Sequence, residues 1–94
     1  MKQPRVRNPV SVGEMLEEEF LKPMEMTQTE LARRLGCAPR VVNELCRGRR
    51  GISAIMAWRL AEVFKNSPEF WMNLQQANDL WNAWLALKEE RAAV

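Results

Sequence analysis

Four polar side chains recur at helical spacing near the middle of this 94-residue chain, and each is able to bond to nucleic acid: Arg40, Asn43, Glu44 and Arg47. A guanidinium pairs with the two acceptors of guanine, an asparagine amide pairs with adenine through two bonds, and a glutamate accepts a hydrogen bond from cytosine. Pro39 offers an apolar contact to a thymine methyl group. We therefore predict that base edges are contacted by Pro39, Arg40, Asn43 and Glu44.

A second group of residues suits the sugar–phosphate backbone. Three arginines lie in a predicted turn that follows directly on the base-reading residues. Gln28 and Thr29 stand at the start of a predicted helix, where free backbone N–H groups attract phosphate oxygens. We predict phosphate contacts for Gln28, Thr29, Arg47, Arg49 and Arg50. The alternative for each arginine is an ordinary solvated charge.

Two short helices joined by a tight turn would hold these groups in place, and together they span residues 28–47. Gly36 ends the first helix, where the backbone needs a positive φ that glycine adopts at little cost. Ala32 is small enough to let the two helix axes approach closely. The inward-facing apolar residues are Leu31, Ala32, Leu35, Val42 and Leu45. This pattern is the signature of a helix-turn-helix motif.

The rest of the chain is predicted to be helical as well. Capping residues indicate helix starts after Ser11, Thr27, Ser53 and Ser67, and Pro39 suits the first position of a further helix. Thr27 and the glutamate three positions on form a T-x-x-E capping box. The predicted helices cover residues 12–21, 28–35, 39–47, 54–64 and 68–90. No segment alternates as a strand does, so the fold class is all-α with five helices.

Charge is sharply segregated along the sequence. Residues 1–10 are predicted as a flexible basic arm, and residues 11–94 as the domain. Residues 9–30 carry six glutamates against one lysine, whereas residues 31–51 carry six arginines against Glu44 alone. A basic block that overlaps a helix-turn-helix motif is the electrostatic footprint of a phosphate-binding face.

Catalysis is not expected from this composition. Histidine and tyrosine are absent and Asp79 is the only aspartate, so few groups suit acid–base chemistry. Cys37 and Cys46 lack partners for a zinc site and are predicted to be reduced packing residues, with no metal and no cofactor. No apolar run is long enough to span a membrane and no leader-like segment begins the chain, so we expect a cytoplasmic protein.

The last predicted helix carries more apolar surface than a small domain can cover. One stripe is predicted to be core: Phe70, Leu74, Ala77, Trp81 and Trp84. Further apolar residues extend this surface nearly all round the C-terminal half, which favours a second chain as partner. We predict a homodimer, with recognition helices about 34 Å apart. The predicted dimer or partner interface is Leu80, Trp81, Trp84, Leu85 and Leu87. The alternative is that Trp58 and the first helix cover this surface.

Several blocks of the sequence carry a family resemblance. They are residues 8–16 (NPVSVGEML) with the glutamates that follow, 48–53 (GRRGIS), 57–61 (AWRLA), and 67–75 (SPEFWMNLQ) followed by 79–80 (DL). In these blocks the chain resembles the HigA-type antitoxins of the Cro/C1 (XRE-like) helix-turn-helix group, over residues 8–85. The family often has histidine at the position of Asn8.

The resemblance implies a lambda-repressor-like fold and a dimeric repressor that binds a palindromic operator in double-stranded DNA. It further implies an antitoxin that neutralises a RelE-like toxin, a ribosome-dependent mRNA interferase encoded beside it. Two other functions stay open. One is a stand-alone helix-turn-helix regulator without a toxin partner, and the other is a helical protein-interaction module whose last helix carries the function.

Overall fold

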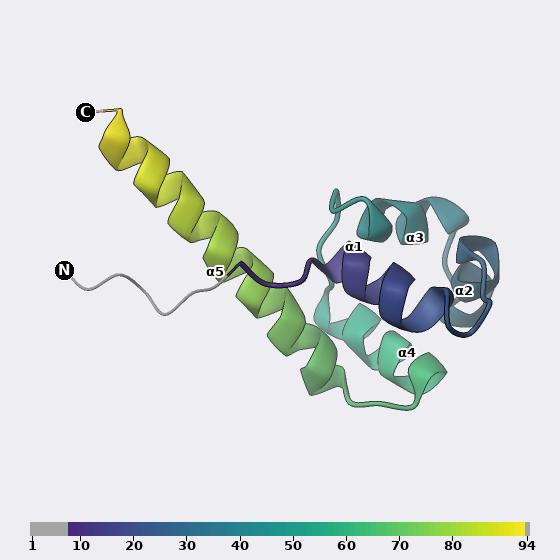
Figure 1. Ribbon diagram of the computed structural model, residues 1–94. Helices are drawn as coiled ribbons and strands as arrows, with labels where there is room; N and C mark the ends of the chain where they lie inside the picture. The colour runs from purple at the N-terminus through teal and green to yellow at the C-terminus, as the bar shows by residue number, and fades with distance from the viewer. Residues whose placement is uncertain (1–7, 94) are drawn as a thin grey trace.

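The computed structural model describes residues 8–93, and within them every regular element is a helix (Figure 1). The elements are α1 (Val12–Glu14), which continues directly as η1 (Met15–Leu21), α2 (Gln28–Leu35), α3 (Pro39–Cys46), α4 (Ala54–Phe64) and α5 (Pro68–Ala92). With α1 and η1 counted as one helix, the predicted all-α fold with five helices is confirmed. No helix among the described residues is both long and apolar enough to cross a membrane.

The predicted helix starts coincide with side-chain caps in the structure. The hydroxyls of Ser11, Thr27, Ser53 and Ser67 each accept a hydrogen bond from a backbone N–H three residues on, over 3.0 to 3.2 Å. Each of these bonds satisfies a donor that has no partner inside the helix. Glu30 does not complete the predicted capping box, because its carboxylate is engaged by Arg33 and Arg34.

The first helix widens into π geometry from Met15 to Leu21. Its hydrogen bonds reach one residue further than those of an α-helix, as in the bond from the Lys22 N–H to the Glu17 carbonyl (2.9 Å). The wider turn brings Leu16 and Leu21, five positions apart, onto the same buried face. An α-helical spacing from Leu16 would place Phe20 on this face, whereas Leu21 is buried and Phe20 is only partly buried.

The core lies between the first helix and α2, α3, α4 and the start of α5. Trp71 is its largest fully buried side chain. The indole N–H donates to the Asn66 side-chain oxygen (2.9 Å), so the ring is buried without an unmatched donor. Phe20, Phe64 and Phe70 surround the ring, with centroids 5.0 to 5.9 Å from its own. This aromatic cluster anchors the first turn of α5 to the domain.

The predicted core stripe of the last helix is largely wrong. Trp71, which was not part of that stripe, is the only fully buried residue of α5, and Phe70 is 37% exposed. The face that meets the domain continues from Trp71 through Leu74 to two polar residues, Gln75 and Asn78. Their amides bond to backbone groups of other segments, namely Ile52 N–H and Val10 carbonyl.

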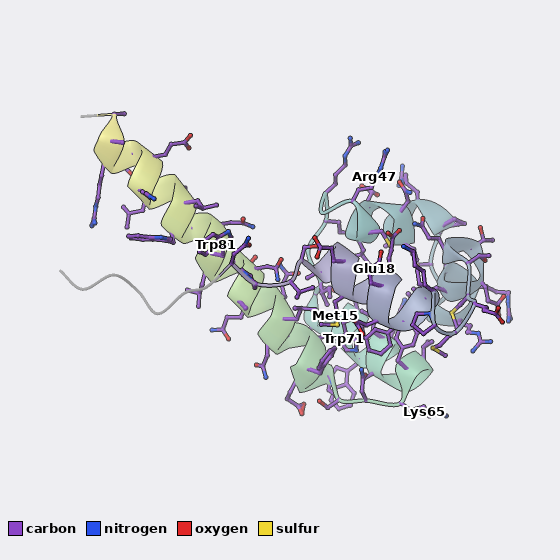
Figure 2. All side chains as sticks on the ribbon, viewed as in Figure 1. Met15, Glu18, Arg47, Lys65, Trp71 and Trp81 are labelled. Carbon is purple, nitrogen blue, oxygen red and sulfur yellow. The ribbon has the colours of Figure 1, made fainter. Side chains whose placement is uncertain are left out.

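The C-terminal half of α5 projects away from the other helices (Figure 1). The helix is 25 residues long, or about 37 Å. The radius of gyration is 15.0 Å, against about 12 Å for a compact chain of this length. Figure 2 shows Trp71 among the packed helices and Trp81 where α5 leaves them. The alternative cover from Trp58 is also wrong, because that side chain is 60% exposed on α4.

The predicted basic arm falls mostly on residues 1–7, which lie outside the described residues. Of its remaining part, Val10 accepts a hydrogen bond from the Asn78 amide over 3.1 Å. The segment that leads into α1 therefore runs across α5. The boundary between arm and domain stays a prediction.

Candidate nucleic-acid interface

The helix-turn-helix motif forms as its sequence pattern predicts. Gly36 adopts a left-handed conformation, with φ of 75°, and the Cys37 N–H donates to the Ala32 carbonyl over 3.0 Å. This closes α2 and sends the chain into α3. All five residues predicted to face inward are buried: Leu31, Ala32, Leu35, Val42 and Leu45.

Helix α3 packs against the first helix through a backbone contact. Gly13 is buried, and a Cβ built on it would lie 2.7 Å from the Cys46 carbonyl carbon, inside van der Waals contact. The end of α3 can therefore approach α1 only because position 13 has no side chain. This contact sets the distance between α3 and the first helix, and with it the position of the outer face of α3.

The outer face of α3 carries the predicted base-reading residues. Pro39, Arg40 and Asn43 are exposed, and Glu44 is partly exposed. The Glu44 carboxylate lies 3.7 Å from the Arg40 guanidinium and 3.3 Å from that of Arg50. These three side chains form one exposed charged group, in which the Glu44 carboxylate is paired with both arginines. Such exposed pairs are weak and separate readily for a stronger partner.

Asn43 has a different neighbour. Its Nδ2 donates to the Gln28 Oε1 over 3.2 Å. The bond places the start of α2 beside the outer face of α3. The backbone N–H groups of Gln28 and Thr29 are free there, because the Thr27 hydroxyl caps only the N–H of Glu30. Two predicted phosphate-binding residues thus adjoin a predicted base-reading residue.

Residues 47–50 form the arginine turn. Gly48 takes φ of 71°, which reverses the chain, and the Arg49 N–H bonds to the Glu44 carbonyl over 2.8 Å. Arg47, Arg49 and Arg50 are exposed. Figure 2 shows Arg47 pointing outward from the end of α3. All three predicted phosphate-binding arginines therefore border the outer face of α3.

The basic face is smaller than the basic block in the sequence. Arg33 and Arg34 lie on α2, and both bond to Glu30. Hydrogen bonds from the two guanidinium groups hold the pKa of Glu30 down at about 2, from an ordinary value of 4.5. Of the six arginines in residues 31–51, these two lie on α2, and the four on α3 and the arginine turn are Arg40, Arg47, Arg49 and Arg50, of which Arg40 and Arg50 share Glu44.

The two cysteines are free thiols, and each is partly buried. Burial and the neighbouring Glu17 carboxylate raise the pKa of the Cys46 thiol to about 12, so it stays protonated and unreactive at neutral pH. Among the described residues, no cluster of cysteine and acidic side chains could hold a metal ion.

Three further polar residues link the interface and its neighbouring segments, and none of them was predicted from the sequence. Glu17 accepts a hydrogen bond from Gln28 Nε2 over 3.0 Å, behind the outer face of α3. Gln75 of α5 accepts from the Ile52 N–H over 2.7 Å and so ties down the segment after the arginine turn. Asn78 anchors residue 10. All three are polar residues joined to distant segments, so hydropathy spacing carries no signal for them.

Comparisons with known proteins agree with this geometry. A model of the helix-turn-helix family matches residues 18–71. The chain is 45% identical over 84 residues to antitoxin HigA-1 of Vibrio cholerae, covering 89% of this chain and 79% of that protein. It is 42% identical over 76 residues to an uncharacterised helix-turn-helix transcriptional regulator of Haemophilus influenzae, covering 81% and 71%. A solved structure of Pseudomonas aeruginosa antitoxin HigA with the higBA promoter superposes with a TM-score of 0.83 at 41% identity, covering 88% of this chain and 90% of that one.

Two helices locked across a glycine turn, with a polar and basic outer face on the second, define a helix-turn-helix DNA-binding protein. The sequence and structure comparisons, which cover most of the chain, assign it to one family within this class. The chain belongs to the HigA antitoxin family of helix-turn-helix proteins. The resemblance and the lambda-repressor-like fold predicted from the sequence are therefore confirmed.

Proposed function

We propose that this protein is a cytoplasmic repressor that binds a palindromic operator as a homodimer and neutralises a RelE-like toxin. The outer face of α3 is the main support for the proposed DNA binding. It exposes Arg40 and Asn43 next to the arginine turn, on a scaffold 41% identical to an antitoxin solved with its promoter. The two relatives described above are named as an antitoxin and as a transcriptional regulator.

In the proposed complex, α3 enters the major groove with its first turns against the base edges. Arg40 pairs with guanine, Asn43 with adenine and Glu44 with cytosine, while Pro39 meets a thymine methyl group. The arginine turn grips the phosphates on one side of the groove, and the start of α2 at Gln28 and Thr29 grips those on the other. Arg40 leaves Glu44 on binding, which costs little for so exposed a pair.

The proposed dimer is formed by the projecting half of α5. Leu80, Leu85 and Leu87 are 53%, 43% and 38% exposed, and Trp81 and Trp84 are only partly covered. An apolar surface of this kind on a soluble helix is normally buried by another chain. A two-fold pair of α3 helices would match a palindromic operator.

The proposed toxin partner rests on the family. A HigA antitoxin is named for a toxin that it opposes, and the chain is similar to such proteins over most of its length. A stand-alone regulator is the second candidate, because one of its relatives is named only as a transcriptional regulator. The adjacent gene distinguishes an antitoxin from a stand-alone regulator. A toxin gene there would encode a small basic protein whose expression alone stops growth. Co-expression of this protein would restore growth only if it is an antitoxin.

A titration with the DNA upstream of the protein's own gene tests the DNA-binding function. We expect a shift at low salt, and a loss of about 1–3 kcal/mol in Arg40→Ala together with relaxed selectivity at one base pair. No shift at low salt would overturn the proposal and favour a protein-interaction module.

A further inference from the structure

Three polar side chains from three different helices form a continuous hydrogen-bonded network. Glu17 of η1 accepts from Gln28 Nε2 over 3.0 Å, and Gln28 Oε1 in turn accepts from Asn43 Nδ2 over 3.2 Å. Glu17 lies outside the helix-turn-helix motif and away from its outer face. The network therefore runs from a partly buried side chain of η1 to a side chain exposed on α3.

The chemistry of the three groups gives the network a single direction. An ionised carboxylate only accepts hydrogen bonds, so the Gln28 amide must turn its NH₂ group toward Glu17. Its oxygen then faces α3, where it can bond only to the NH₂ group of Asn43 and not to the Asn43 oxygen. Without Glu17, the Gln28 amide could present either its oxygen or its NH₂ group to Asn43.

The orientation imposed on Asn43 is the one that adenine requires. One N–H of Asn43 is used by Gln28, which leaves its second N–H and its Oδ1 available at the surface. Adenine presents an acceptor at N7 and a donor at N6 in the major groove, so it matches this donor and acceptor pair. An amide turned the other way would offer the wrong atom to each position.

Glu17 is itself held in place. Its carboxylate lies beside the partly buried Cys46 thiol, the residue whose backbone rests against Gly13. Its own carbonyl accepts from the Lys22 N–H in the widened turn of η1. With its backbone hydrogen-bonded and its carboxylate beside a partly buried thiol, Glu17 is a stable reference for the Gln28 amide.

We propose that Glu17 is a positioning residue for base reading: it sets the Gln28 amide, which in turn sets Asn43 for adenine before DNA arrives. This inference rests on the proposed role of Asn43 in base contact. Glu17 touches no DNA in this scheme, and its effect is confined to the base pair that Asn43 reads.

The test compares Glu17→Gln with Glu19→Gln, an exposed residue of the same helix. Both variants remove one negative charge, so their effects on phosphate attraction are matched. The probes are a duplex from upstream of the protein's own gene, a shuffled duplex of the same composition, and duplexes with 7-deazaadenine at single positions. In the wild type, 7-deazaadenine weakens binding at the adenine that Asn43 contacts, because it lacks N7.

We expect Glu17→Gln to lose discrimination at that one position on the order of fivefold, less than Asn43→Ala loses, because a free amide is still correctly oriented part of the time. Glu19→Gln should retain wild-type discrimination. In the Asn43→Ala background, Glu17→Gln should cause no further loss. Gln28→Ala, which breaks the network at its middle, should show the same loss of discrimination at that position, on top of a uniform loss of affinity from its proposed phosphate contact, and it covers the case that Glu17→Gln unfolds.

Two results would overturn the inference, and they differ from a failure of the proposed function. Wild-type discrimination in Glu17→Gln, or a loss spread evenly over all positions, would show that Glu17 does not act through Asn43. Unaltered discrimination in Asn43→Ala would overturn the base contact itself and the positioning role with it.

Discussion

Gly13 and Cys46 meet backbone to backbone, so that a Cβ on Gly13 would lie 2.7 Å from the Cys46 carbonyl carbon and closer still to its oxygen. The contact joins the first helix to the last turn of α3, one residue before the arginine turn. Any side chain at position 13 would push the recognition helix outward. The position of the whole DNA-facing surface therefore depends on the absence of one methyl group.

Gly13→Ala should destabilise the protein and weaken its DNA binding together. Alanine gains about 1 kcal/mol of helix propensity, but separating two packed backbones costs more, so we expect a net loss of about 1–3 kcal/mol in the free energy of unfolding. Urea denaturation measures this loss. Glu14→Ala, one position on and exposed, is the control and should change little. An unchanged urea midpoint in Gly13→Ala would contradict the contact.

Arg49→Ala should weaken binding to all DNA sequences alike. Its exposed guanidinium lies in the arginine turn, where it would release one counterion on meeting a phosphate. We expect the slope of log K against log salt to fall in magnitude by about 0.9. Arg33→Ala removes the same charge from a residue that is paired with Glu30, so its slope should remain that of the wild type. Equal slopes in both variants would argue against the predicted phosphate contact.

Leu80→Glu should dissociate the proposed dimer. A two-fold interface receives the substitution twice, so the dissociation constant should rise on the order of a hundredfold. Sedimentation velocity across a concentration series measures the change. Ile55→Glu is a matched control, because Ile55 is 63% exposed on α4 and Leu80 is 53% exposed on α5. A dimer that survives Leu80→Glu, or dissociates only in Ile55→Glu, would move the interface away from α5.

Glu30 should contribute to stability in a pH-dependent way. Its pKa is lowered to about 2 by Arg33 and Arg34, so its contribution is complete above the ordinary value of 4.5 and is lost as the pH falls toward 2. Glu30→Gln should therefore have a lower Tm than the wild type at pH 7, and the two should converge near pH 2. The gap is expected to be small, since the ion pairs are exposed. Glu19→Gln serves as the control, and a gap that persists unchanged to pH 2 would refute the assignment.

Local features of this protein were predictable because their causes are local. A serine or threonine hydroxyl caps the N–H group three residues on, so Ser11, Thr27, Ser53 and Ser67 mark helix starts whatever the rest of the chain does. Gly36 takes a positive φ because only glycine does so cheaply. The burial of residues such as Leu31 and Val42 follows from the spacing of helical turns. The motif and its exposed face could therefore be derived from residue order.

The arrangement around α5 was not predictable in the same way. Spacing predicted a stripe through Trp81 and Trp84 as core, whereas the helix is anchored by Trp71 and continues its contact through Gln75 and Asn78. Which face of a helix meets the domain depends on the groups opposite it. Here those groups include backbone N–H and carbonyl groups, which attract polar side chains and leave leucines outside.

The sequence by itself determined the helices, the glycine turn, the basic block and the family, because each arises from neighbours along the chain. The tertiary structure decided how the reading residues are oriented. Asn43 is bonded through Gln28 to Glu17. The bonds from Glu17 to Asn43 join residues 11 and 15 positions apart on three helices, and no periodicity of a single helix connects them. Their geometry exists only once the three helices have packed.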